Sequence, residues 1–214
     1  MLKWIGLLLG DAAGAESQIL RQLLKESPEY PDWSLAVRPV LARLVERSRI
    51  RRPIDCKVLD MPVFNALALP HKTIVLSQLL VHFCRDQRDQ MAFVIAHEVA
   101  HIHLGHARKR SWANALMNVA PLANPLLGAG LRMLFDLAYT REQEFEADNL
   151  AVKLLARAGY APSASIALLE RLVVASAPGN VVSTLMSTHP PVNERVSQLR
   201  ELVHKCQNRT PTFL

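Results

Sequence analysis

Residues 97–101 read HEVAH, so two histidines stand four positions apart and a glutamate follows the first. On an α-helix, side chains four positions apart lie on the same face, which lets His97 and His101 bind one metal ion. Glu98 lies beside them and can accept a proton from a water molecule that zinc activates. The motif therefore predicts a hydrolytic zinc site, on the condition that these residues are helical.

The residues around the motif predict that helix. Between residues 86 and 110, apolar side chains recur at intervals of three and four, with alanines favouring helix between them. The apolar positions are Met91, Val94, Ile95, Val99 and Ile102. Polar residues 85–89 form the start, and Gly105 weakens the helix before the basic run 108–110. The motif is thus expected in the middle of a helix, on a half-buried face.

A catalytic zinc ion usually has three protein ligands, so the motif requires a further His, Asp or Glu. Residues 140–148 read TREQEFEAD, and helical periodicity divides their acids between two faces. The polar face comprises residues 142, 146, 149, 153 and 157, and the inward face comprises residues 144, 148, 151 and 155. A bound metal would neutralise Glu144 and Asp148, two inward acids one turn apart. We expect Glu144 to be the third ligand and Asp148 to accept the spare N–H of a liganding histidine. The alternative is an ordinary charged helix.

These two motifs resemble those of the HtpX-like gluzincin metallopeptidases, the family that also contains the CAAX prenyl proteases. Residues 65–70, followed by 73–76, resemble the edge strand of that family. Residues 187–191 read STHPP and, with Glu194 and Arg195, resemble its C-terminal motif. The resemblance extends over residues 65–200.

The resemblance implies a role for each matching residue. Glu144 would bind zinc with His97 and His101. Asp148 would contact one of these ligands without binding the metal itself. His189 would act in catalysis, contacting the substrate or the developing oxyanion. Substrate binding would involve Asn65, Ala66 and Arg195, the first two on a strand that pairs with an extended peptide. Without the resemblance, His189 would be read as a structural histidine before two prolines at a helix start.

The order of elements predicts an α+β fold that is mostly helical. Helices are expected near 15–25 and 34–49, short strands near 55–59, 65–69 and 73–76, and helices from there to the end. By the resemblance, the fold is zincin-like, with a small three-stranded sheet packed on the HEVAH helix. With 214 residues, half of them hydrophobic, we predict a single zinc metallopeptidase domain over 1–214. Its parts are N-terminal helices (1–54), the sheet and HEVAH helix (55–110), an apolar segment (111–139) and the third-ligand and C-terminal helices (140–214).

Residues 112–139 form a second apolar stretch. Because His101 and Glu144 must reach one zinc ion, a membrane excursion between them would have to cross the bilayer twice. Two crossings need about forty apolar residues, more than this stretch contains. We therefore predict a lid over the site or an interfacial segment that contacts a membrane peripherally.

Composition narrows the class and the location. The net charge is +6, but only 6% of residues are aromatic and no aromatic side chains alternate with the basic ones, so nucleic-acid binding is not expected. The three cysteines lack paired spacing, which favours a reducing compartment. We expect the cytoplasm or the cytoplasmic face of a membrane, with the periplasm as the alternative if residues 1–15 are a signal peptide.

Taken together, the sequence predicts a zinc metalloendopeptidase with one Zn²⁺ per chain. Its substrates would be extended peptides or unfolded proteins, and the resemblance suggests misfolded or membrane-associated ones. The alternative is a peptide-binding chaperone or adaptor that keeps the zinc fold without cleaving, a reading that the intact Glu98 disfavours.

Overall fold

The computed structural model describes residues 12–48, 50, 51, 53–109, 139–175, 189 and 192–208, except for the side chains of 192, 207 and 208. The strands are β1 (Asp55–Leu59), β2 (Ala66–Ala68) and β3 (Thr73–Ser77). The helices are α2 (Ala12–Glu26), α3 (Pro31–Glu46), α4 (Gln78–Phe83), α5 (Arg88–His103), α8 (Arg141–Ala158), α9 (Ala164–Ala175) and α11 (Val192–Asn208). The fold is α+β and mostly helical, as predicted, and α4 is an addition to the predicted order.

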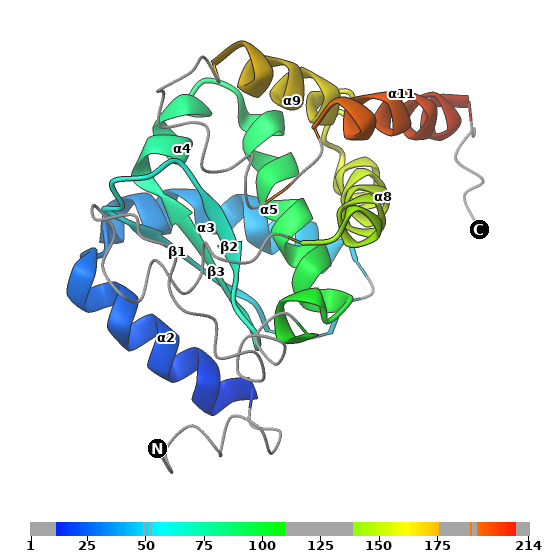
Figure 1. Ribbon diagram of the computed structural model, residues 1–214. Coiled ribbons are helices and arrows are strands. Elements are labelled where there is room, and N and C mark those ends of the chain that lie inside the picture. Colours follow the sequence, from blue (N-terminus) through cyan, green and yellow to red (C-terminus); the bar gives the residue numbers. More distant parts are fainter. Residues whose placement is uncertain are drawn as a thin grey trace.

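A three-stranded sheet forms one side of the core (Figure 1). Central β3 pairs in parallel with β1 and antiparallel with β2, so β2 stands at one end of the strand order. Alternate side chains of a strand point to opposite faces. Ile74 and Leu76 accordingly pack into the main core with α3 and α5, whereas Val75 packs with Leu23 of α2 on the other face. Both faces of the sheet are therefore covered by helices.

Helix α5 runs through the middle of the protein, between the sheet and α8 (Figure 1). Every residue from Gln90 to Ile102 is buried. The expectation of a half-buried face is therefore wrong, because β2, β3, α3, α8 and α9 together surround the helix. The packing of the sheet against this HEVAH helix was predicted and is confirmed.

Helix α5 also ends earlier than expected. It stops at His103, and Gly105 takes a left-handed backbone conformation with φ of 74°. A Cβ at this position would meet only the Arg108 side chain, at 4.0 Å, so the positive φ is what favours glycine. Residues 106–109 then form a separate helical turn. The single helix expected over 86–110 is thus two segments with a bend between them.

Helix α8 begins with a capping box. The Thr140 side chain accepts a hydrogen bond from the backbone N–H of Gln143, whose own side chain accepts one from the backbone of Thr140. Gly159 ends the helix in a left-handed conformation. Between these ends, Glu144 and Asp148 are buried. Residues 142, 146, 153 and 157 are exposed and residue 149 is intermediate, so the predicted division of faces is confirmed.

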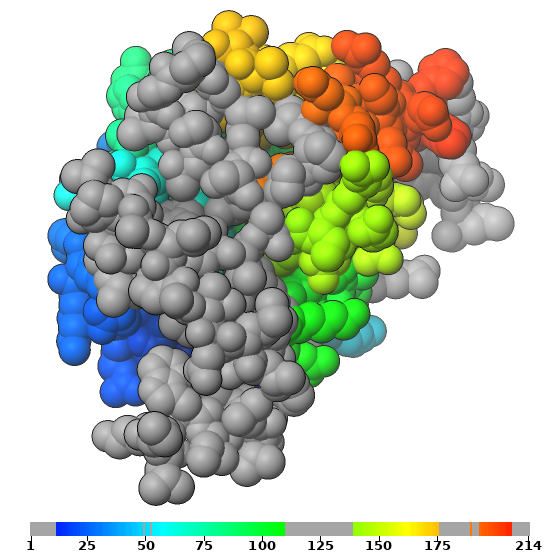
Figure 2. Space-filling view, in the orientation of Figure 1, coloured from blue at the N-terminus to red at the C-terminus, as the bar shows by residue number. Residues whose placement is uncertain are grey.

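Helices α8, α9 and α11 lie on the side of the core away from the sheet (Figure 1). Figure 2 shows them as adjoining yellow-green, yellow and orange surfaces. Contacts join α11 to both other helices, which brings residues near the C-terminus against the acidic helix α8.

Two predictions fall on parts of the chain outside the described residues. The lid or interfacial segment over 112–139 is one of them, with only Tyr139 described. The possible signal peptide in residues 1–15 is another, because the description begins at Ala12. The location that depends on it stays a prediction, as does the extent of the single domain. In the portion of the chain that is described, no helix combines the length and apolar character needed to cross a bilayer.

Candidate active site

Helix α5 carries the three residues of the motif into the buried interior. His97 is 5% exposed, and Glu98 and His101 are still less accessible. One turn of helix separates the two histidines, and their Nε2 atoms lie 3.0 Å apart. Burial, the main cause, holds the pKa of His101 well below its ordinary value, which favours the neutral form that a metal needs.

Helix α8 brings Glu144 to the same point. Its Oε2 lies 3.4 Å from Nε2 of His97 and its Oε1 lies 3.2 Å from Nε2 of His101. Burial by itself would raise the pKa of Glu144, but His189, Arg195 and His97 outweigh it and hold this pKa well below the usual range. The side chain is therefore ionised, as a carboxylate ligand must be.

The arrangement fits a zinc ion. Ligand atoms about 2.0–2.1 Å from a tetrahedral zinc lie roughly 3.3 Å from one another. The nitrogen and oxygen atoms of His97, His101 and Glu144 are 3.0 to 3.4 Å apart. His189 joins them in a group of four buried residues whose possible ligand atoms all lie within 4.8 Å of one another.

Charge supports the same conclusion. The carboxylates of Glu98, Glu144 and Asp148 are buried here with one guanidinium, that of Arg195. Burial, the largest influence, lowers the pKa of His97, but Glu144 and Asp148 outweigh it and raise this pKa to about 9, so without a metal this ring is positively charged. Metal binding requires neutral histidines, and the three carboxylates and one guanidinium then leave an excess of two negative charges. Uncompensated charge is costly to bury, and a divalent cation would balance this excess.

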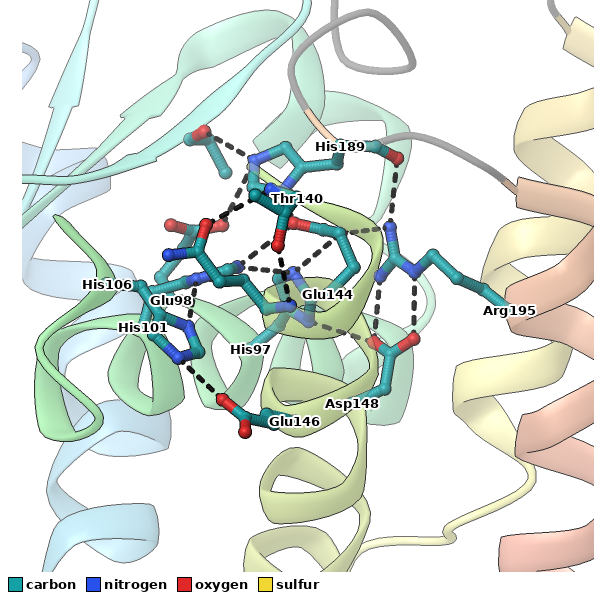
Figure 3. A network of polar contacts seen from close by, with 12 residues as sticks. His97, Glu98, His101, His106, Thr140, Glu144, Glu146, Asp148, His189 and Arg195 are labelled. Atoms are coloured by element: carbon teal, nitrogen blue, oxygen red, sulfur yellow. Dashed lines mark hydrogen bonds and ion pairs between the residues drawn. The ribbon is translucent and has the colours of Figure 1, made fainter. Parts of the chain in front are cut away.

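Asp148 and Arg195 form a buried pair beside the histidines (Figure 3). Nδ1 of His97 lies 2.9 Å from Oδ1 of Asp148. Arg195 donates from Nε and Nη2 to the two oxygens of Asp148, each at 2.8 Å, and its Nη1 lies 2.7 Å from Oε2 of Glu144. Burial, the largest influence, opposes charge on both groups, yet their mutual attraction lowers the pKa of Asp148 and raises that of Arg195. Both therefore remain charged.

His189 contacts both Glu144 and Glu98. Its Nδ1 lies 2.9 Å from Oε1 of Glu144, and its Nε2 lies 3.6 Å from Oε1 of Glu98 and 3.5 Å from the backbone oxygen of Ala66. Arg195 donates to the backbone oxygen of His189 at 3.2 Å. The structure thus brings a residue far along the chain next to the motif.

The three residues expected to bind substrate, Asn65, Ala66 and Arg195, differ from one another in their contacts. Ala66 is the first residue of β2 and lies beside His189. Asn65 is buried, and its side-chain oxygen accepts a hydrogen bond from the backbone N–H of Ala66. Arg195 is 3% exposed and engaged by Asp148 and Glu144, so its observed contacts are with the site itself.

Two residues near His101 were missed by the sequence reading. The ring of Tyr139 stacks on the His101 imidazole, with centroids 3.7 Å apart and an interplanar angle of 14°. His106 contacts a nitrogen of the same ring, with its Nδ1 3.1 Å from Nδ1 of His101. For His106, the sequence offered two signals: it follows the HEVAH motif by five residues, and Gly105 directly before it can end the helix.

A small apolar cavity of about 40 Å³ adjoins the site. It is lined by Ala66, His97, Glu98, His189 and Arg195 from the site and by Phe93, Val94, Leu168, Leu169 and Leu172 from helices α5 and α9. Because Glu98 and His189 form part of its wall, a side chain in this cavity would lie beside the candidate reacting groups.

Known proteins are similar in sequence to this chain. Residues 35–203 match peptidase family M48. The chain is 27% identical over 194 residues to "Mitochondrial metalloendopeptidase OMA1" of Schizosaccharomyces pombe, which covers 86% of this chain and 57% of that protein. It is 28% identical over 203 residues to "Beta-barrel assembly-enhancing protease" of Escherichia coli, covering 85% of this chain and 41% of that protein. It is 33% identical over 155 residues to "Mitochondrial metalloendopeptidase OMA1" of Arabidopsis thaliana, covering 67% of this chain and 30% of that protein.

The chain spans little more than half the length of the first of these relatives, and less of the other two. The match to the family nevertheless covers most of this chain and includes HEVAH, Glu144 and His189. The chain therefore belongs to peptidase family M48, and its resemblance to the HtpX-like metallopeptidases is confirmed.

Proposed function

We propose that this M48 metallopeptidase is a zinc endopeptidase in which His97, His101 and Glu144 hold the metal. The observation that carries the proposal is the convergence of their nitrogen and oxygen atoms, 3.0 to 3.4 Å apart, next to the buried carboxylate of Glu98. When bound, zinc supplies Lewis acidity toward a peptide carbonyl and makes water more acidic.

Glu98 is the proposed general base. Its Oε2 is buried and has no hydrogen-bonding partner among the described residues, so this oxygen is left to accept a proton from water. A base in this position can then deliver the proton to the leaving amine. Glu98 does not need to bind the metal for either step.

His189 is the proposed contact to the substrate carbonyl. Glu144 already engages its Nδ1, so Nε2 is the nitrogen that remains for the substrate. This nitrogen points to the region between Glu98 and Ala66, where a peptide bond presented to Glu98 would lie. Because Nδ1 donates to the Glu144 carboxylate, Nε2 can donate as well only when the ring is doubly protonated. In that form, a hydrogen bond from Nε2 would stabilise negative charge developing on the carbonyl oxygen.

Substrates would bind in extended form along residues 65–69. In this mode, backbone hydrogen bonds supply affinity for many sequences and pockets add side-chain preference. The adjoining apolar cavity favours an apolar side chain next to the scissile bond. Unfolded or misfolded segments, including those of membrane-associated proteins, expose both an extended backbone and apolar side chains. Peripheral membrane contact through 112–139 belongs to the same proposal.

The second candidate is a peptide-binding chaperone or adaptor that keeps the zinc fold and does not cleave. The names of the relatives, an endopeptidase and a protease, favour cleavage. Casein hydrolysis by the wild type beside a Glu98→Gln variant of equal zinc content tests the choice. Zinc-dependent cleavage lost in the variant supports the endopeptidase, and a wild type that binds zinc and peptide without cleaving supports the adaptor.

Asp148→Asn is expected to weaken zinc binding by about 10- to 100-fold, the usual consequence of losing a partner of a liganding histidine. Asparagine keeps the shape but removes the charge that His97 and Arg195 contact. Competition with a chromophoric chelator measures the change. Asp86→Asn is the matched control, since the side chain of Asp86 is 81% exposed. Equal zinc affinity in both variants would contradict the assigned role of Asp148.

A further inference from the structure

The two candidate histidine ligands are supported in different ways on the side away from the metal. His97 contacts the carboxylate of Asp148 directly. His101 instead contacts another imidazole, with its Nδ1 3.1 Å from Nδ1 of His106. Nε2 of His106 in turn lies 3.0 Å from Oε2 of Glu146 (Figure 3). This chain of contacts leads from a fully buried ligand to a side chain that is 64% exposed.

We propose that His106 and Glu146 are positioning residues that set the tautomer and ring orientation of His101. This inference rests on the proposed function, because it takes Nε2 of His101 as the atom that binds zinc. A neutral imidazole carries one proton, so metal on Nε2 leaves the proton on Nδ1. Nδ1 of His101 must then donate, and Nδ1 of His106 must accept.

The next contact follows from the same rule. With Nδ1 of His106 acting as acceptor, its proton lies on Nε2, which donates to the carboxylate of Glu146. Each ring nitrogen of His101 and His106 thus has a single role, as metal ligand, hydrogen-bond donor or hydrogen-bond acceptor. A hydrogen-bonded partner on the far nitrogen typically fixes a liganding histidine and strengthens its bond to the metal.

The bend after α5 makes this arrangement possible. Each residue of an α-helix turns the chain by about 100°, so a side chain five positions after His101 would lie about 140° around a continuous helix. The left-handed Gly105 ends α5 and starts a new turn, and His106 returns to a buried position beside His101. Tyr139 stacks on the face of the His101 ring. The ring is therefore held both at its face and at Nδ1.

Three substitutions of His106 separate hydrogen bonding from packing. Asparagine places its side-chain oxygen near the position of Nδ1 and keeps the acceptor for His101. Glutamine places its amide nitrogen near the position of Nε2 and keeps only the contact to Glu146. Leucine keeps neither. His103→Gln is the matched control, since His103 is an exposed histidine at the end of α5, the helix that carries His101.

Zinc affinity of the full chain, measured by chelator competition, is the main readout. We expect His106→Gln and His106→Leu to lose about 10- to 100-fold in affinity, and His106→Asn to recover most of that loss. In zinc-loaded protein with ¹⁵N-labelled histidine, the Nδ1–H signal of His101 should persist in the wild type and in His106→Asn and disappear in His106→Gln. Glu146→Ala should give a smaller loss of affinity than His106→Leu, and Glu142→Ala should give none.

The competing explanation is that His106 only fills space. An equal loss of affinity in the asparagine, glutamine and leucine variants would establish that explanation and overturn the inference. Tight zinc binding by the wild type and His106→Leu alike would overturn this inference and leave the proposed function standing. A wild type that binds no zinc would overturn both.

Discussion

Glu98→Gln is expected to retain zinc and fold while losing about 10²- to 10⁴-fold in the rate of peptide hydrolysis, the usual contribution of a general base. The change replaces a carboxylate that can accept a proton by an amide of the same shape that cannot. Glu98 is outside the proposed ligand set, and its Oε2 has no hydrogen-bonding partner among the described residues. Removing its charge therefore leaves the contacts of His97, His101 and Glu144 intact.

The measurement is the initial rate of casein or peptide cleavage at equal zinc content. Glu142→Gln is the control, because it makes the same chemical change at an exposed position of α8. Thermal melting of both variants should agree with the wild type within a few degrees. Equal cleavage rates in the wild type and Glu98→Gln would reject the proposed base, and cleavage unaffected by zinc removal would reject the metal site as well.

Helical periodicity was sufficient to predict which side chains form the candidate metal-binding group. On α8, it separated buried Glu144 and Asp148 from exposed Glu142 and Glu146, because a helix packed on one side must keep its charged stripe in solvent. On α5, spacing of four residues placed His97 and His101 together. In both helices the geometry is local, so the sequence contains it.

The same reasoning failed where long-range packing decides the environment. Helix α5 was expected to be half-buried because its apolar residues recur at intervals of three and four, with polar residues between them. Those polar residues are the buried histidines and Glu98, covered by elements from both halves of the chain. Periodicity reports which face is polar, but it does not distinguish solvent from a buried polar site.

Arg195 and His106 illustrate two further limits. Arg195 was assigned to substrate binding by resemblance, while its guanidinium contacts Asp148, 47 residues away in sequence. No local pattern predicts such a pair. His106 returns to His101 only because Gly105 adopts a positive φ, which glycine permits and a repeating helical pattern does not reveal.

Glu144→Ala is expected to have the second large effect, abolishing tight zinc binding. The change removes one of three proposed ligands, and we expect a loss of zinc affinity greater than about 100-fold, beyond that of an outer partner. It also deprives Arg195 of its contact at 2.7 Å and His189 of its contact at 2.9 Å. Glu142→Ala, on the exposed face of the same helix, should leave zinc binding unchanged.

Thermal melting with and without zinc measures the effect of Glu144→Ala independently of catalysis. A ligand that binds only the folded state stabilises it by about 4 kcal/mol at a thousand times its dissociation constant. The wild type and Glu142→Ala should therefore melt at a clearly higher temperature when zinc is added, and Glu144→Ala should not. A Glu144→Ala variant that keeps the full zinc-dependent shift would show that the metal is held by other residues. Of the four clustered side chains, His189 would then be the one to test as the replacement ligand.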